Sequence, residues 1–511
     1  MKLLAFLKSS LQIRPHLQPK HHLEQVPSPC RLALPTLPSL KDETENASSA
    51  RQFPYDDEVF RIIFSFLSVH DLVSFSETCK DAREVAMPHL LSSVTFGFHS
   101  QVAICRFCAT VLAEPHRADL LQKLSVTNSA VTDNAVHSDL NDLAIVLLCK
   151  VLVLARRLSV VDIDHFEMFL SRHPGVARTF IANARLLELM LCDIGPLTLG
   201  MVARMSSPDL WNLDLTAKSD KGQAAFSFSE FQQSLVALPR LTHLTLRNIV
   251  FACDEAPIVP CTTIHTLRLL ICILPIRHAM HAFPSVRRLE LGCGYDTIMP
   301  TSGDPNARWG KLERLVCSLD DYDVWSLVAP IYRLDVADDL IELSYCFERA
   351  RHCAVRVLSF HVKCDHDLMQ PFRACVDVPT TLQFVEFTLV PHDLPNIKAP
   401  KTRRREDGKW VCDMTEGQQQ WVHTITEVAL FFAKLGLRGI FLCLRLRTFC
   451  EYDEGVTQET VSTFVRTLAR ACPIEFVGVA VNTAFGYMES YPVQPCEREA
   501  ARWWRIVGEK R

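Results

Sequence analysis

A recurring pattern of apolar residues is the feature that most constrains how this chain can fold. The unit is apolar-x-x-apolar-x-apolar, and it returns between residues 186 and 479. The clearest copies are Leu186/Leu189/Leu191, Leu210/Leu213/Leu215, Leu241/Leu244/Leu246, Ile264/Leu267/Leu269, Val286/Leu289/Leu291 and Leu312/Leu315/Cys317. Weaker copies begin at Ile331, Val355, Leu382, Leu437 and Ile474.

Each copy predicts a short strand. Alternate residues of a strand point to the same face, so the last two apolar residues of a copy would enter one shared core. The first six copies start 24, 31, 23, 22 and 26 residues apart, which overlaps the period of leucine-rich repeats. We therefore expect an α/β fold in which an irregular, leucine-rich-repeat-like solenoid follows a small helical module. The alternative is a generic α/β domain with leucine-rich strands.

The helical module is predicted upstream, in residues 58–83. Apolar residues at helical spacing predict one broad stripe on a first helix: Val59, Ile62, Ile63, Phe66 and Leu67. Ser68, with Asp71 three residues later, predicts a capped second helix. Pro88 predicts that a third helix ends near Met87. Three short helices bury little surface, so this module requires a neighbour or a partner.

This run resembles the F-box family. The first half of the family pattern is matched by Glu58, Val59, Ile63, Phe64, Ser65, Phe66 and Leu67, and the second half by Asp71, Leu72, Ser76, Cys79 and Lys80, without a gap. The chain departs from the family at three places. Tyr55 and Asp56 stand in place of the usual Leu-Pro, Val69 in place of a frequent Pro, and Ala82 in place of a frequent Trp.

The resemblance implies a substrate-recognition subunit of a cullin–RING (Skp–cullin–F-box) ubiquitin ligase. Such a subunit docks on a Skp-type adaptor through its F-box and performs no chemistry itself. The residues expected to bind the adaptor or to form the F-box core are Val59, Ile63, Phe66, Leu67 and Leu72. Ile63→Asp with Leu67→Asp should abolish adaptor binding, because burying carboxylates in an apolar interface is costly.

The repeat surface would then hold a protein target of unknown identity. Candidate target-facing residues lie between the apolar residues of the repeats: Arg247, Arg268, Arg288 and Glu290. The departures from the family motivate an alternative, a protein-binding scaffold with a degenerate F-box that enters no ligase. An enzyme on an α/β repeat scaffold is a third possibility.

Composition shifts divide the chain into parts. Residues 1–50 are proline-rich and predict a disordered leader. Residues 52–96 hold the F-box-like helices, and residues 97–511 the solenoid. A proline-containing and charged stretch at about 390–420, which includes Arg403, Arg404 and Arg405, predicts an exposed insertion.

Composition also disfavours several classes of protein. A net charge of -4 disfavours a nucleic-acid-binding surface, and the sequence holds no apolar run of about 18 residues for a membrane span. Twenty cysteines without a small secreted framework indicate reduced thiols, and hence the cytoplasm, the nucleus or both. Cys105 and Cys108 form one pair without a second, so no metal is expected. No phosphate-binding or hydrolase motif occurs, so we expect neither a cofactor nor a catalytic site.

Overall fold

The computed structural model divides into two compact units, unit 1 from Met1 to Asp164 and unit 2 from His165 to Arg511. It describes residues 57–96, 101–127, 138–218, 226–252, 258–292, 309–319, 322, 329–340, 343–364, 379–391, 403–406, 409–412, 427, 428, 430–432, 435, 437–445, 466, 476–482 and 502–505. The leader predicted at 1–50 lies outside these residues. The domain boundary predicted at 96/97 stays a prediction.

The described part of unit 1 begins with three helices and continues into a parallel sheet. The helices are α2 (Asp57–Phe66), α3 (Val69–Ser76) and α4 (Lys80–Ser92). They are followed by β1 (Ser93–Phe96), α5 (Gln101–Ala113), η1 (Pro115–Leu120), β2 (Lys123–Val126), α6 (Ser138–Leu154) and β3 (Val160–Ile163). Strand β2 lies between β1 and β3, and both pairings are parallel.

Local capping explains where the second and third helices start. The amide of Asp71 donates to the Ser68 hydroxyl oxygen at 3.2 Å, and the Ser68 amide donates back to the Asp71 carboxylate at 3.2 Å. This reciprocal capping box confirms the predicted start of α3. The Cys79 sulfur accepts from the Ala82 amide at 3.3 Å and caps α4 in the same way.

The predicted end of the third helix near Met87 was wrong. Helix α4 runs through Pro88 to Ser92. Proline removes one helical hydrogen bond, but Pro88 lies on the exposed side, where water can reach the carbonyl that loses its donor. Leu90 and Leu91, two and three residues after the proline, are buried. Their burial favours continuing the helix beyond the proline.

Unit 2 repeats a strand followed by a helix or an irregular return. Its parallel strands are β4 (Glu188–Ile194), β5 (Asn212–Ala217), β7 (His243–Arg247), β9 (Thr266–Leu270), β10 (Arg288–Gly292), β11 (Leu312–Cys317), β12 (Ile331–Leu340), β13 (Val357–Cys364), β14 (Phe384–Pro391), β17 (Gly439–Arg445) and β18 (Phe476–Asn482). Its helices include α7 (Phe166–Arg172), α8 (Gly175–Ala182), α9 (Pro196–Val202), α10 (Phe228–Val236), α11 (Ile276–Ala282) and α13 (Leu343–His352). The short strands β6 (Phe226–Ser227) and β8 (Phe251–Ala252) pair beside them.

All eleven predicted copies in unit 2 form strands, and these strands pair in register. The central apolar residues face one another across the sheet: Leu189, Leu213, Leu244, Leu267, Leu289, Leu315, Leu334, Leu358, Val385, Ile440 and Val477. The first ten of them are buried. Each fully buried aliphatic side chain contributes about 1.5–3 kcal/mol to folding, so a one-residue slip of any strand would be costly.

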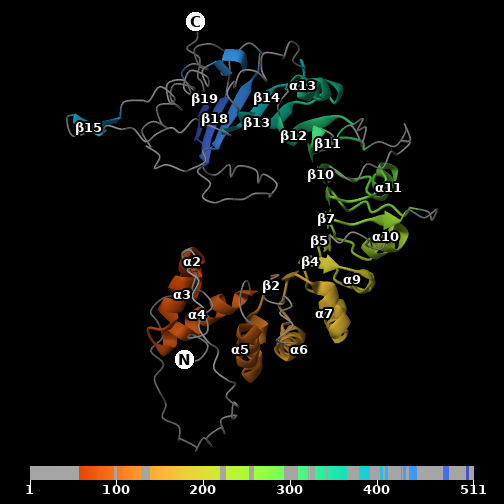
Figure 1. Cartoon of the computed structure of the whole chain (residues 1–511). Coiled ribbons are helices and arrows are strands. Elements are labelled where there is room, and N and C mark those ends of the chain that lie inside the picture. The colour runs from red at the N-terminus through yellow and green to blue at the C-terminus, as the bar shows by residue number, and fades with distance from the viewer. Residues whose placement is uncertain are drawn as a thin grey trace, which may run out of the picture. The chain divides into compact units, whose positions relative to one another are not determined.

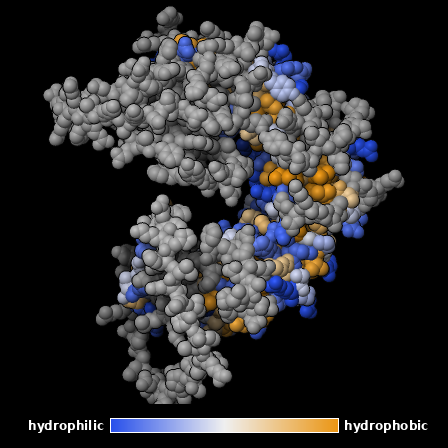
Figure 2. Space-filling model, viewed as in Figure 1, coloured by the Kyte–Doolittle hydropathy of each residue, from blue (hydrophilic) through white to orange (hydrophobic). Residues whose placement is uncertain are grey.

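Strands and helices occupy opposite faces of unit 2, as Figure 1 shows for α9, α10 and α11. The ladder residues point toward the helices, and the alternate residues form the other face. Figure 2 shows hydrophobic residues gathered over the repeats of unit 2, with hydrophilic residues beside them. The predicted α/β fold class is confirmed, a helical module followed by a parallel sheet with helices. The leucine-rich-repeat assignment stays a prediction.

Three further copies of the repeat lie in unit 1, where the sequence did not reveal them. They are Leu91/Val94/Phe96, Leu121/Leu124/Val126 and Leu158/Val161/Ile163, on β1, β2 and β3. Val94 pairs with Leu124, and Leu124 with Val161. The first of these copies begins within α4, and longer helices, α5 and α6, separate the three. Their spacings are 30 and 37 residues, and the second exceeds the 22–31 residues that separate the first six copies of unit 2.

The predicted insertion contains a hairpin. Strands β15 (Arg403–Glu406) and β16 (Lys409–Cys412) pair antiparallel with each other and belong to no other sheet. The charged run of Arg403 to Arg405 therefore lies on a strand of this hairpin. The last strand, β19 (Arg502–Arg505), pairs antiparallel with β18 and ends the run of parallel pairings.

The described cysteines form no disulfide, and most of them are buried. Burial raises the pKa of Cys261 and of Cys272 to about 11, whereas Cys79 is exposed. At pH 8 iodoacetamide should therefore alkylate Cys79 well before Cys261 or Cys272. Peptide mass mapping over time checks this order. Equal labelling of the three thiols in the folded chain would contradict it, and urea should make the rates converge.

Candidate functional site

Helix α2 is apolar on two faces. Phe60 and Phe64, one turn apart, are buried, and their rings lie 5.5 Å apart. Val59, Ile63 and Phe66 lie on the other side of the helix and are exposed.

The inner face of α2 builds the core of the helical module. Its buried members are Phe60, Phe64, Leu72, Val73, Ala86 and Leu90, and Leu67, Phe75 and Val85 pack against them. The Phe64 ring is central, with its centroid 5.3 Å from that of Phe75 and 4.9 Å from that of His89, edge-on. These contacts join all three helices into one small core.

The outer face of α2 is an exposed apolar surface, which we call the α2 stripe. It consists of Val59, Ile62, Ile63 and Phe66. Phe66 is 83% exposed, Ile62 61% and Ile63 46%. Val69, at the start of α3, is also exposed and lies beside the end of this helix in the sequence. Contiguous exposed apolar side chains of this size mark a surface that a partner covers.

The five residues predicted for adaptor binding or core therefore divide between two locations. Val59, Ile63 and Phe66 lie in the α2 stripe, whereas Leu72 is buried in the core and Leu67 packs against it. The single apolar stripe predicted from the sequence thus combines residues of the exposed face of α2 with Leu67, which packs against the core. Sequence reasoning did not place Phe60 or Phe64 in the core, although their i, i+4 spacing was a usable signal.

The sheet of unit 2 carries a second candidate surface, which we call the open face. It is the face opposite helices α9, α10 and α11, formed by the residues that alternate with the buried ladder. Charged residues on neighbouring strands pair across it. The four predicted target-facing residues lie here, on β7, β9 and β10.

These four residues are engaged with charges on the chain itself. The Nε of Arg268 donates to one oxygen of Glu290 at 2.7 Å and its Nη2 to the other at 2.9 Å. The hydrogen bond to Glu290 raises the pKa of Arg268. Arg247 lies 3.8 Å from Asp214, and Arg288 3.9 Å from Glu313. Arg268 and Glu290 thus satisfy each other, whereas the pairs of Arg247 and Arg288 are loose.

A tighter network lies farther along the open face. Arg333 donates to Asp335 at 2.8 Å and also to Glu386, while Arg314 donates to Asp335. Burial opposes the charge on Arg333, but its bonds to the two carboxylates outweigh burial and raise its pKa. Four alternating charges therefore hold β11, β12 and β14 together. Sequence reasoning missed this network, although Arg288, Arg314 and Arg333 occupy the same repeat position.

Comparison with known families decides the nature of the helical module. Residues 56–91 match the family model described as the F-box domain. The chain carries an F-box domain. F-box domains bind Skp-type adaptors within cullin–RING ligases, and F-box proteins in general are non-catalytic adaptors. This indicates a role as the F-box subunit of such a ligase.

Other comparisons add little. No curated protein matches the chain. Among solved structures, a protein from Bacteroides fragilis is similar at 12% identity and a TM-score of 0.24, with 66% of this chain and 78% of that one covered. A likeness at that TM-score carries no argument here.

The F-box domain accommodates two of its departures from the family pattern. Val69, where proline is frequent, is exposed at the start of α3. Ala82, where tryptophan is frequent, is 1% exposed, so neighbouring side chains already close the space around it. Tyr55 and Asp56 lie outside the described residues.

The described residues hold no group of three or more histidine, cysteine, aspartate or glutamate side chains placed to bind a metal. Within the same ranges, no helix has the length and apolar character to cross a membrane. Cys105 and Cys108 lie on α5, one turn apart, and burial raises the pKa of both thiols. A raised pKa disfavours the thiolate, which is the form that binds metals.

Proposed function

We propose that this chain is the substrate-recognition subunit of a Skp–cullin–F-box ubiquitin ligase, and that a Skp-type adaptor docks on the α2 stripe. The observation that carries the proposal is the exposure of Val59, Ile62, Ile63 and Phe66 on one side of a helix within an F-box domain. Leu67 and Leu72 act on the other side, where they support the helix from within the module.

Physical chemistry supports this assignment. Covering apolar surface yields roughly 25 cal/mol for each Å² removed from water, and a large aromatic residue near the centre of an interface often dominates its energy. Phe66 is the most exposed large apolar residue of those described, so it has the most to gain from a partner. The core beneath it fixes α2 in place, which lowers the entropy lost on binding.

The chain itself would perform no chemistry in this role. It would hold a target near the ubiquitin thioester and so raise the effective concentration of the target lysine. We place the target on the repeat surface of unit 2 and propose that the complex works in the cytoplasm, the nucleus or both. Neither nucleic acid nor a membrane is part of the proposal.

Affinity purification of the full chain, followed by mass spectrometry, tests the proposal. We expect an adaptor, a cullin and a RING subunit to copurify with the wild type, because the adaptor bridges the chain to the cullin. A protein deleted of residues 52–96 should lose these subunits together while retaining candidate targets. Recovery of targets without any ligase subunit from the wild type would instead favour the scaffold with a degenerate F-box.

A further inference from the structure

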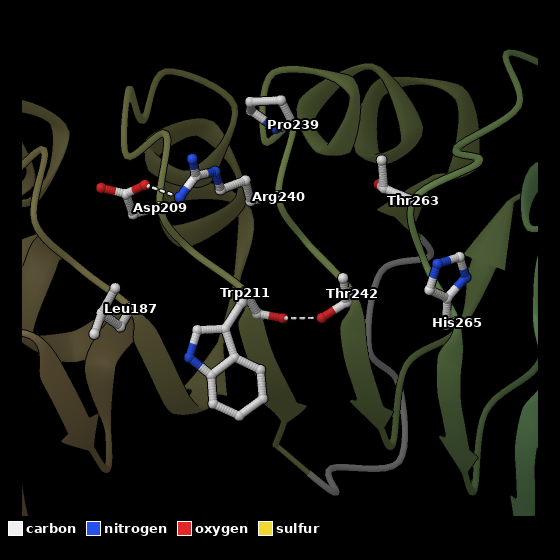
Figure 3. Close-up of a pocket in the computed structure, with 8 residues that line it drawn as sticks. All are labelled: Leu187, Asp209, Trp211, Pro239, Arg240, Thr242, Thr263 and His265. Atoms are coloured by element: carbon white, nitrogen blue, oxygen red, sulfur yellow. Dashed lines mark hydrogen bonds and ion pairs between the residues drawn. The ribbon is translucent and has the colours of Figure 1, made fainter.

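A shallow pocket of about 690 Å³ lies where four neighbouring strands of unit 2 begin (Figure 3). Its floor is a row of residues that directly precede or start β4, β5, β7 and β9. Eight residues line it: Leu187, Asp209, Trp211, Pro239, Arg240, Thr242, Thr263 and His265. The pocket is thus built by equivalent positions of successive repeats.

One end of the pocket is apolar. Trp211 and Leu187 are 36% and 39% exposed, although both neighbour fully buried leucines in the sequence. The indole of Trp211 stands edge-on to the His243 ring, with centroids 5.0 Å apart and planes at 89°. That contact fixes the indole orientation, so binding a partner there loses little side-chain entropy. Exposed, fixed tryptophans are the residues that most often dominate protein interfaces.

The backbone amides along the floor of the pocket are already used within the sheet. The amides of Thr242 and His243 both donate to the Trp211 carbonyl, at 3.1 and 2.9 Å. The amides of His265 and Thr266 donate to the Thr242 carbonyl, each at 3.0 Å. Along this floor a ligand would therefore be recognised through side chains. It would not add a strand to the sheet here.

The rim of the pocket is electrically neutral. Asp209 and Arg240 form an ion pair at 2.7 Å, visible as the upper dashed line in Figure 3. The Thr242 hydroxyl donates to the Trp211 carbonyl at 3.3 Å. The pocket itself therefore selects for an apolar side chain, and any selection by charge comes from its ends.

The end beyond His265 is positively charged. The amides of Arg287 and Arg288 donate to the His265 carbonyl at 2.9 and 3.0 Å, which places both residues on the next repeat. Their side chains are each 62% exposed, and their guanidinium groups share one carboxylate, Glu313, at 3.6 and 3.9 Å. Two cations against one anion leave a net positive charge, in contrast to the one-to-one pair of Arg268 and Glu290.

The charge of this end reaches the pocket. The pKa of His243 is lowered by burial first and by the Arg288 guanidinium next. At the opposite end of the row, Glu188 begins β4 and adds negative charge. The electrostatic potential along the row therefore changes from negative at β4 to positive at β10. An acidic group of a bound partner is favoured beyond His265.

We propose that the pocket and the Arg287–Arg288 end together bind an extended segment of a target protein that carries an apolar side chain and, nearby, an acidic one. The apolar side chain packs on Trp211, and the acidic side chain reaches Arg288. Neighbouring strands lie about 4.8 Å apart, so the three strand steps from Trp211 to Arg288 span about 14 Å. An extended peptide rises about 3.3 Å per residue, so the two side chains are about four residues apart.

The inference rests on the proposed function, because it names the chemistry of the target. Synthetic peptides of four designs in a Gly-Ser background, the first of them made in two versions, test it by fluorescence polarisation with the full chain. The first peptide carries Trp and Glu four residues apart, with Glu on either side of Trp in two versions. The others replace Glu by Lys, replace Trp by Ser, or place the two residues side by side.

We expect the Trp-Glu peptide to bind about tenfold more tightly than its Lys and Ser counterparts, in at least one of its two orientations. Trp211→Ala should weaken it about tenfold, and Arg288→Glu should reverse the preference toward the Lys peptide. Matched controls on the helix side, Leu197→Ala and Arg178→Glu, remove an exposed apolar and an exposed basic side chain and should change nothing.

Three results would overturn the inference. They are equal affinity for the Glu and Lys peptides, no binding by any peptide up to about 1 mM, and equal losses in the control variants. Adaptor capture, measured on the same preparations, separates the two proposals. Captured adaptor without peptide selectivity contradicts this inference alone, and peptide selectivity without captured adaptor contradicts the proposed function alone.

Discussion

Ile63→Asp combined with Phe66→Asp should lower adaptor capture by at least about a hundredfold while the chain stays folded. Both side chains are exposed and lie outside the F-box core, so folding costs little when they change. In a complex, the two carboxylates would be buried against an apolar surface without partners. Biolayer interferometry with purified adaptor measures the loss, and circular dichroism confirms the fold.

Two comparisons make this result specific to the α2 stripe. Leu143→Asp combined with Val153→Asp changes two exposed apolar residues of α6 in the same unit and should leave adaptor capture intact. Leu67→Asp is a poor probe, because Leu67 packs against the core and its loss would weaken binding by destabilising the domain. Undiminished capture by the folded Ile63/Phe66 variant would assign the adaptor to another surface.

Glu167→Ala should lower the free energy of unfolding of unit 2 by about 2–4 kcal/mol. This α7 carboxylate accepts the amides of Gly195, Leu197 and Thr198 at 2.8–2.9 Å and the Thr198 hydroxyl at 2.7 Å. It therefore satisfies the start of α9 from another helix. Gly195 and Thr198 are buried, so alanine at 167 would leave their donors without a partner.

Urea unfolding followed by tryptophan fluorescence measures this change. Glu348→Ala, which removes an exposed carboxylate on α13, should cost less than about 0.5 kcal/mol and serves as the control. Gly195→Ala should also destabilise, because a Cβ there would lie 2.5 Å from the Glu167 carboxyl carbon. Both substitutions disrupt the same contact. The double variant should therefore lose less stability than the sum of the losses measured for the two single variants. Full additivity would refute the shared contact.

Short-range patterns predicted most of the sheet. Each copy of the apolar unit in unit 2 forms a strand, because its alternation buries two residues on one side. Since every copy buries the same two positions, neighbouring strands pair in the same register. The copies on β1, β2 and β3 have the same pattern, but the helices between them vary in length, and the period fades. The apolar pattern was sufficient to predict the strands of unit 2. The spacing between copies did not show that the parallel strands begin as early as β1.

The candidate sites were less predictable, for reasons of geometry. Both faces of α2 are apolar at helical spacing, so the spacing of Phe60 and Phe64 marks a second apolar face but does not by itself show which of the two faces turns inward. Arg268 and Glu290 looked like target contacts, but they lie opposite each other on neighbouring strands and pair. Only the register between strands reveals such partners.

The direct join between α4 and β1 bears on how a bound adaptor would orient the first strands of unit 1. Ser92 ends the helix, Ser93 begins the strand, and the Ser92 carbonyl accepts the Gln122 amide at 2.9 Å. No linker separates the F-box from the first strands. An adaptor that binds the module would therefore also fix the orientation of β1 and β2. In a ligase, β1 and β2 would therefore turn together with the bound adaptor and not independently of it.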